Sequence, residues 1–81
     1  MNQQQILERL QPIFDALFLD PPKLHPELTA KDVPEWDSLM QISVVVSVEK
    51  EFNVKFHVGE VESTKNVGEF ADLILRRMSE S

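Results

Sequence analysis

Ser38 is the residue of this chain whose type and position most directly suggest chemistry. It lies in the tripeptide Asp37-Ser38-Leu39, shortly after Pro34 and at the start of a long stretch without Gly or Pro. A phosphate attached to a serine at the start of a helix meets free backbone N–H groups and the positive end of the helix dipole. The competing interpretation is a helix cap, because Ser38 and Gln41 have the spacing of a capping box. Local pattern alone favours the cap.

Catalysis by Ser38 finds no support in the sequence. A nucleophilic serine needs a base, usually a histidine, that is oriented by a third group, and it needs an oxyanion hole. His25 lies in a proline-rich segment and His57 in an expected turn, and no spacing relates either to Ser38. Two histidines with scattered carboxylates form no metal signature, and the absence of cysteine excludes thiolate sites and disulfides. We expect neither an enzyme nor a metal site.

The composition of the chain limits the classes of partner that we expect it to bind. The chain has 81 residues, which predicts one domain over residues 1–81. Fourteen acidic against eight basic residues give a net charge of −6, and the largest basic cluster is Arg76-Arg77. We therefore expect no binding to nucleic acid or to membranes, and a basic surface on a partner protein fits better. No apolar run is long enough to span a membrane, and we expect a cytoplasmic monomer.

The segment from Trp36 to Phe52 must position Ser38, and its pattern predicts a helix. At about 100° per residue its apolar side chains fall into two stripes, roughly 140° apart around the axis. One stripe can pack on the rest of the domain, and it consists of Val44, Val45, Val48 and Phe52. The other, with Met40 beside it, consists of Leu39, Ile42 and Val46. An apolar stripe without a partner inside the fold is typical of a docking surface.

A strand is the alternative for this segment, because residues 42–48 are rich in β-branched side chains. Against a strand, Val44, Val45 and Val46 are consecutive, so the segment lacks an alternation with period two. It also continues through Glu49-Lys50-Glu51 without a turn signal, which is ordinary for a helix and long for a strand. We predict the helix.

Two further helices are expected to complete the bundle. Asn2 and Gln5 have the spacing of a capping box for a first helix that ends near Phe18, with a kink or a restart at Pro12. Asn66 is a good N-cap for a last helix that ends beyond Arg77.

The connections between the helices carry their own signals. Leu24, Leu28 and Val33 have the spacing of anchors in a long proline-rich connection over residues 20–37, and Thr29 can cap a single turn through Asp32. Phe56, Val58 and Val61 indicate a short apolar segment with one helical turn around Glu60. The sum is an all-α four-helix bundle with three main helices, one short helix and a long first loop.

Three residues near the central helix each allow two interpretations. Trp36 is either a partly buried anchor of the turn into the helix or a contact for a partner. Asp37 is either a second capping oxygen or a carboxylate that is recognised by a partner. Glu49 lies on the side of Leu39 and is either a solvated charge or half of an intermolecular ion pair, which would steer association.

The chain resembles the acyl carrier proteins. Asp37-Ser38-Leu39 at the head of a helix that ends in Glu49-Lys50-Glu51-Phe52 is similar to their phosphopantetheine-attachment region. Asp32-Val33 before the serine and Asn66-Val67-Gly68-Glu69 at the last helix fit the same order of elements over nearly the whole chain. The tripeptide alone is weak, whereas its combination with length, acidity and element order is fairly specific.

This resemblance implies an acyl-carrier-like bundle that acts as a carrier. A phosphopantetheinyl transferase would attach 4′-phosphopantetheine covalently to Ser38, next to Asp37, and the thiol of the arm would hold an acyl group as a thioester. Acyl-loading and acyl-processing enzymes are the implied partners. They would meet the central helix at the positions that match the family's contact residues, namely Leu39, Met40, Ile42, Val46 and Glu49.

Departures from the family pattern favour a specialised pathway, such as polyketide or related secondary metabolism. Glu35-Trp36 stands where many fatty-acid carriers have a glycine, and Met40, Ser43 and Lys50 occupy positions that are often acidic. Two alternatives stay open. One is an aminoacyl or peptidyl carrier with the same arm, and the other is a helical protein-interaction module that is never modified.

Overall fold

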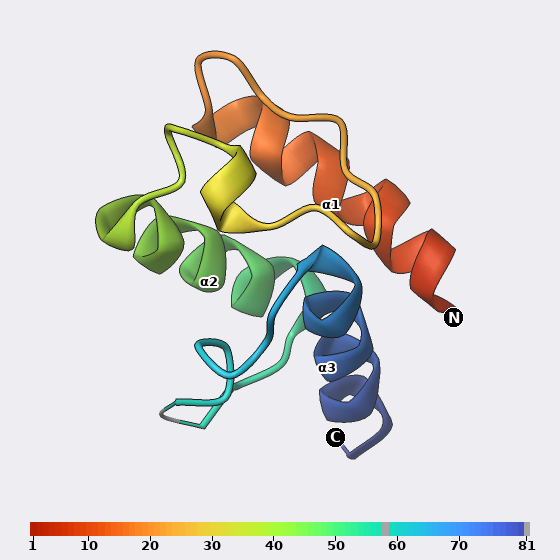
Figure 1. Cartoon of the computed structure of the whole chain (residues 1–81). Helices are drawn as coiled ribbons and strands as arrows, with labels where there is room; N and C mark the ends of the chain where they lie inside the picture. Colours follow the sequence, from red (N-terminus) through yellow and green to blue (C-terminus); the bar gives the residue numbers. More distant parts are fainter. Residues whose placement is uncertain (58, 81) are drawn as a thin grey trace.

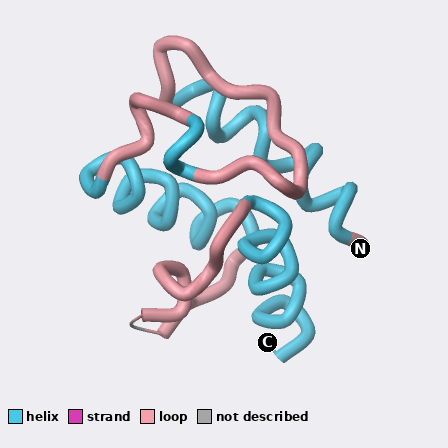
Figure 2. Tube along the Cα trace, viewed as in Figure 1, coloured by secondary structure: helices cyan, strands magenta, loops and turns pink. Residues whose placement is uncertain are grey.

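The computed structural model describes residues 1–57 and 59–80, and it contains helices and loops but no strand within them (Figure 2). The element order is α1 (Gln3–Leu17), the 3-10 helix η1 (Ala30–Asp32), α2 (Ser38–Phe52) and α3 (Val67–Glu80) (Figure 1). The all-α architecture with a long first loop is confirmed. The central segment is helical, so the alternative of a strand is wrong.

α1 begins at the predicted capping box. The Asn2 side chain accepts a hydrogen bond from the N–H of Gln5 at 2.9 Å, and the Gln5 side chain accepts one from the N–H of Asn2 at 3.0 Å. The helix is continuous through Pro12, so a restart there is wrong. Glu8 and Pro12 are both exposed, and the carbonyl that loses its helical partner therefore lies on the solvated side of α1.

One apolar core joins the three helices, and α1 packs against both α2 and α3. Its fully buried side chains come from all three, and they include Ile6, Leu10, Phe14, Val44, Val48, Val67 and Ile74. The stripe of α2 that was predicted to be internal is buried at Val44, Val48 and Phe52 and half-buried at Val45. α2 ends at Asn53, which adopts the left-handed conformation (φ 54°) that commonly terminates helices.

The long connection over residues 18–37 is pinned to the bundle. Leu28 and Val33 are buried and Leu24 is half-buried, as their spacing predicts. The Gln11 amide of α1 donates to the carbonyl of Pro22 and accepts from the N–H of Leu24, both at 2.9 Å. These contacts hold the first part of the connection along α1.

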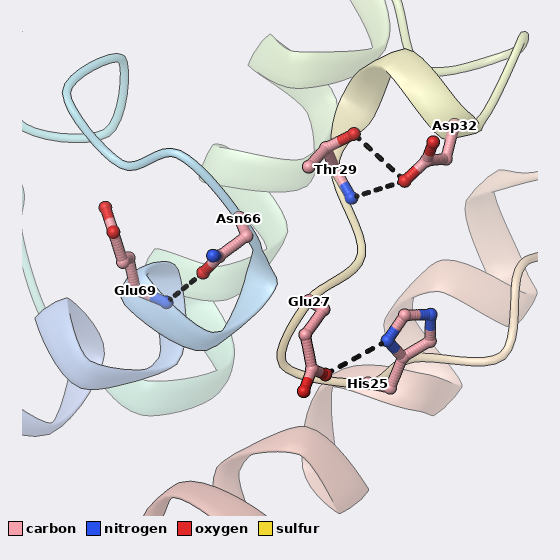
Figure 3. Close-up of polar contacts among 6 residues, drawn as sticks. All are labelled: His25, Glu27, Thr29, Asp32, Asn66 and Glu69. Atoms are coloured by element: carbon pink, nitrogen blue, oxygen red, sulfur yellow. Dashed lines mark hydrogen bonds and ion pairs between the residues drawn. The ribbon is translucent and has the colours of Figure 1, made fainter.

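η1 is the single turn that was predicted between Thr29 and Asp32. The Asp32 carboxylate accepts hydrogen bonds from the N–H and the hydroxyl of Thr29 at 3.2 and 3.0 Å (Figure 3). Around Glu60, residues 59–63 form consecutive turns, and the N–H of Ser63 donates to the carbonyls of Gly59 and Glu60 at 3.2 and 3.3 Å, so the expected helical turn does not extend into a longer helix. Gly59 has a φ of 86°, so a right-handed helix cannot continue back through this residue. Val58 of the expected apolar segment lies outside the described residues.

α3 begins where the long connection meets it. The N–H of Val67 donates to the carbonyl of Leu28 at 2.8 Å, and the N–H of Gly68 donates to that of Pro26 at 2.9 Å. Asn66 caps the helix as predicted, since its side-chain oxygen accepts from the N–H of Glu69 at 2.8 Å (Figure 3). None of the described helices is both long and apolar enough to cross a bilayer.

Gly68→Ala should destabilise the protein although alanine is the better helix former. A Cβ at this position would lie 2.9 Å from the Pro26 carbonyl oxygen and 3.0 Å from the Pro26 Cβ. We expect a net loss of about 1–3 kcal/mol in urea unfolding, as in other overpacked sites. Ser43→Ala on the exposed side of α2 is the control and should be nearly neutral. A Gly68→Ala protein as stable as wild type would contradict the close packing.

Candidate functional site

Asp37, not Ser38, caps α2. The Asp37 carboxylate accepts a hydrogen bond from the N–H of Met40 at 2.9 Å, and Asp37 has the extended backbone of an N-cap. Ser38 is the first helical residue, so the capping box of Ser38 with Gln41 is wrong. Both residue types are good caps, and the helix begins at Ser38, one residue earlier than that box requires. Of the two interpretations of Asp37, the structure supports the capping oxygen.

The Ser38 hydroxyl is left free by this arrangement. Ser38 is exposed, and within the described part of the chain its hydroxyl makes no hydrogen bond. His25 contacts Glu27 at 3.4 Å (Figure 3), and no described contact joins either histidine to the serine. The site therefore offers an accessible hydroxyl without a neighbouring histidine base. A reaction at this oxygen would need a base from outside this chain's histidines.

Trp36 anchors the turn that delivers the serine. Its ring stands edge-on to Phe14 at a centroid distance of 5.0 Å and to Phe18 at 6.3 Å. Its indole N–H donates to the side-chain oxygen of Gln41 in the first turn of α2. The interpretation of Trp36 as a partly buried anchor is confirmed, because these contacts tie the turn both to α1 and to α2.

Glu35 closes the long connection beside this anchor. One carboxylate oxygen accepts from the N–H of Leu19 at 2.9 Å, and the other accepts from that of Asp20 at 2.8 Å. The two ends of the connection are thereby held together just before Trp36. No sequence signal identifies this contact, because the partners are far apart in the chain and both donors are main-chain groups.

The second apolar stripe of α2 is exposed, as predicted. Leu39 is 76% exposed, Ile42 61% and Val46 45%, and their spacing places them on one side of the helix. Met40, which was predicted beside them, is half-buried and packs against the core. A continuous row of large apolar side chains in water has no function inside the fold, and such rows mark sites of interaction.

Glu49 contributes to the fold at the far end of this stripe. It is half-buried, and one of its carboxylate oxygens accepts a hydrogen bond from the N–H of Phe56 at 3.1 Å. The residue therefore holds the segment after α2. This contact belongs to neither of the interpretations given above, since both treated Glu49 as unbonded within the chain.

A pocket of about 410 Å³ opens beside Ser38. It lies between the start of α2, the long connection and the segment that leads into α3, and its walls include Leu28, Trp36, Gln41, Lys65, Asn66 and Phe70. The sequence analysis did not find this pocket, because its residues come from separate segments. Local signals identified Leu28 and Trp36 as anchors and Asn66 as a cap, but none of them indicated that these side chains share a pocket.

An ion pair holds the segment after α2 against α3. The Glu60 carboxylate bonds with the Arg77 guanidinium and accepts from the N–H of His57 at 2.6 Å. The bond from His57 lowers the pKa of Glu60 below its ordinary value of 4.5; partial burial opposes this and Arg77 reinforces it. Because the pKa is lower in the folded chain, the carboxylate stabilises the fold above pH 4.5. That contribution is lost as the pH falls through the folded-state pKa.

Comparisons with known proteins identify the same region. A family model described as a phosphopantetheine attachment site matches residues 36–74. The chain is 34% identical over 80 residues to an acyl carrier protein of Thermosynechococcus vestitus, and the match covers 98% of this chain and 99% of that one. The solution structure of a holo acyl carrier protein from Geobacter metallireducens superposes with a TM-score of 0.83 at 38% identity. That match covers 93% of this chain and 87% of the other.

Replacing the cap and replacing the serine should have different effects on stability. Asp37→Ala removes the bond to the Met40 N–H and should cost about 1 kcal/mol in urea unfolding. Ser38→Ala removes an exposed hydroxyl and should change stability by less than about 0.5 kcal/mol. If Ser38→Ala proved the more costly change, the serine would be the cap after all.

The two stripes of α2 should also differ when they are truncated. Phe52 is 6% exposed, and Phe52→Ala should cost about 3–5 kcal/mol because it leaves a cavity. Ile42 is 61% exposed, so Ile42→Ala should cost less than about 1 kcal/mol. Chemical unfolding of both variants under one set of conditions checks this, and equal large losses would refute the assignment of the stripes.

Proposed function

Because the chain belongs to the acyl carrier protein family, we propose that it carries acyl groups as thioesters on an arm attached to Ser38. The covalent cofactor of this family is 4′-phosphopantetheine. The family acts by carrying a bound group rather than by catalysis. The arm supplies the thiol that a chain without cysteine lacks.

The free hydroxyl of Ser38 is the observation that carries this proposal. The hydroxyl is exposed, it is not needed for capping because Asp37 accepts from Met40, and it opens beside a pocket. The residues at the site therefore fit a covalently attached group. Modification of the serine would break no hydrogen bond of the described structure.

Attachment of the arm is a transfer of a phosphoryl group. A phosphopantetheinyl transferase would bind coenzyme A with magnesium, and a base on that enzyme would take the Ser38 proton. The serine oxygen forms a new P–O bond, the pyrophosphate bond of coenzyme A breaks, and adenosine 3′,5′-bisphosphate leaves. The role of this chain is to present the oxygen on a rigid helix start, which Trp36 and Asp37 hold in place.

The exposed stripe of α2 is the proposed contact for the transferase and for the acyl-loading and acyl-processing enzymes. Leu39, Ile42 and Val46 supply apolar surface within one helix length of the serine, and Met40 adds its exposed part. Glu49 would contribute charge, although one of its oxygens already bonds Phe56. A basic surface on the partner fits the net charge of −6.

We further propose that this carrier serves a specialised pathway. The exposed side of α2 includes the neutral Ser43 and the basic Lys50. This side is therefore less negative than the net charge of −6 of the whole chain suggests. Glu35 and Trp36, which replace a glycine of many fatty-acid carriers, are here used to fix the connection and the turn. These features support a carrier that meets a dedicated set of enzymes.

Intact-mass measurement after incubation with coenzyme A, magnesium and a broad-specificity phosphopantetheinyl transferase tests the attachment. We expect a gain of one phosphopantetheine in wild type and none in Ser38→Ala. Ser43→Ala, which removes another exposed serine of α2, is the matched control and should be modified like wild type. The same gain in Ser38→Ala would place the arm elsewhere.

Loading of the modified protein distinguishes the remaining classes. Transfer of an acyl group to the arm by an acyltransferase supports the acyl carrier, whereas loading only by an amino-acid-activating enzyme would make the chain an aminoacyl carrier. No mass gain in folded wild type with several transferases would leave an unmodified interaction module. In that case the Ser38→Ala protein would function as well as wild type.

A further inference from the structure

A groove of about 420 Å³ lies between α1 and α2, and it shares no wall residue with the pocket beside Ser38. The wall from α1 is apolar and consists of Pro12, Ile13, Ala16 and Leu17. The wall from α2 is polar and consists of Ser47, Lys50 and Glu51. Apart from Lys50, none of these residues has a part in the function proposed above.

The wall from α1 offers apolar side chains in rows. Pro12 and Ala16 are exposed, whereas Ile13 and Leu17 are half-buried and pack on the core. Residues four apart are neighbours on a helix, so these four side chains form two short parallel rows. Side chains of a second helix can insert between such rows, and apolar grooves of this form bind helices of partner proteins.

Lys50 gives the groove a positive charge that the fold does not use. Glu51 is the acidic residue of the walls, and its carboxylate bonds the Arg9 guanidinium at 2.8 Å. The Lys50 ammonium, by contrast, forms no ion pair within residues 1–57 and 59–80. The groove can therefore attract a carboxylate, which the net charge of −6 of the whole chain repels.

Ser47 adds a second donor next to this charge. Its side chain is half-buried, and its hydroxyl has no hydrogen-bond partner in the part of the chain that the structure describes. Ser47 and Lys50 are three residues apart and thus neighbours on α2, so one carboxylate can accept from both. Lys50 also lies one turn beyond the exposed Val46, and the groove therefore continues the exposed stripe of α2.

We propose that the groove between α1 and α2 docks a helix of a partner protein, which seats apolar side chains on α1 and places a carboxylate beside Ser47 and Lys50. The carboxylate distinguishes this contact from the basic surface that suits the rest of the chain. One acidic group within an otherwise basic face fixes the orientation of the partner and disfavours partners that present a lysine there. The inference does not depend on attachment at Ser38.

Titration of a synthetic peptide into the ¹⁵N-labelled protein tests the groove. The probe is a blocked helical peptide of about 15 residues, with a row of leucines and one glutamate beside that row. Two otherwise identical peptides carry glutamine or lysine in place of the glutamate. We expect amide shifts centred on residues 12–17 and 47–51. The glutamate peptide should bind about two- to five-fold more tightly than the glutamine peptide, as an exposed ion pair allows.

Charge reversal and filling of the groove provide the variants. Lys50→Glu should reverse the preference, so that the lysine peptide binds more tightly than the glutamate peptide. Lys55→Glu makes the same change at an exposed lysine outside the groove and should keep the wild-type preference. Ala16→Gln places a longer neutral side chain in the wall and should weaken all three peptides by about tenfold. Ser79→Gln, at an exposed position of α3, should leave their binding unchanged.

Three results would overturn the inference. One is the absence of saturable shifts at the groove with every peptide up to about 1 mM. Another is binding centred on the exposed stripe that Ala16→Gln does not weaken. The third is equal binding of the glutamate and glutamine peptides, or a preference that Lys50→Glu does not reverse. If Ala16→Gln lacks the amide spectrum of a native fold, the reversal at Lys50 decides.

The titration and the mass measurement fail independently. The peptides are added to the unmodified protein, so a negative titration leaves attachment at Ser38 intact. A missing mass gain would refute the carrier function and leave the groove as a docking site.

Discussion

The position of Ser38 depends on the packing of Trp36. Its ring stands against Phe14 of α1, and its indole N–H bonds Gln41 of α2, so one side chain joins the two helices at the point where the chain turns. Aromatic pairs of this kind stabilise a fold by about 0.5–1.5 kcal/mol beyond the free energy gained by burying their surface. Since Ser38 follows two residues later, its place relative to the bundle is set before the helix begins. The same contact orients Gln41 and forms one wall of the pocket.

Two requirements compete for the side-chain positions of α2. It must bury Val44, Val48 and Phe52 against α1, and it exposes Leu39, Ile42 and Val46 on another side. A helix that is apolar on two sides has few positions left for polar side chains. Its β-branched residues also have a lower helix propensity than alanine or leucine. The Asp37 cap at its start and the left-handed Asn53 at its end compensate by fixing both termini. The stability of the fold therefore does not explain why this apolar stripe is exposed.

The sequence predicts features whose signals lie within one segment, and it does not predict contacts between segments that are far apart in the chain. Pro34 and Asn53 bound α2, and the period of its apolar residues separates the buried stripe from the exposed one, because both signals lie within the segment. The choice between Asp37 and Ser38 as the cap was not available from sequence, since either type suits the position. The helical turn that was expected near Glu60 is limited to the consecutive turns of residues 59–63, because turn-forming residues support several hydrogen-bond patterns.

The connections, more than the helices, determine the surroundings of Ser38. The first connection is fixed by Glu35 at its ends and by the bonds of Pro26 and Leu28 to the start of α3. The second is fixed by Glu49 and by the Glu60–Arg77 pair. Because the pocket lies between these two connections and α2, neither could loosen without opening it. The surroundings of Ser38 in this chain therefore depend on a few connection residues as well as on the helical core.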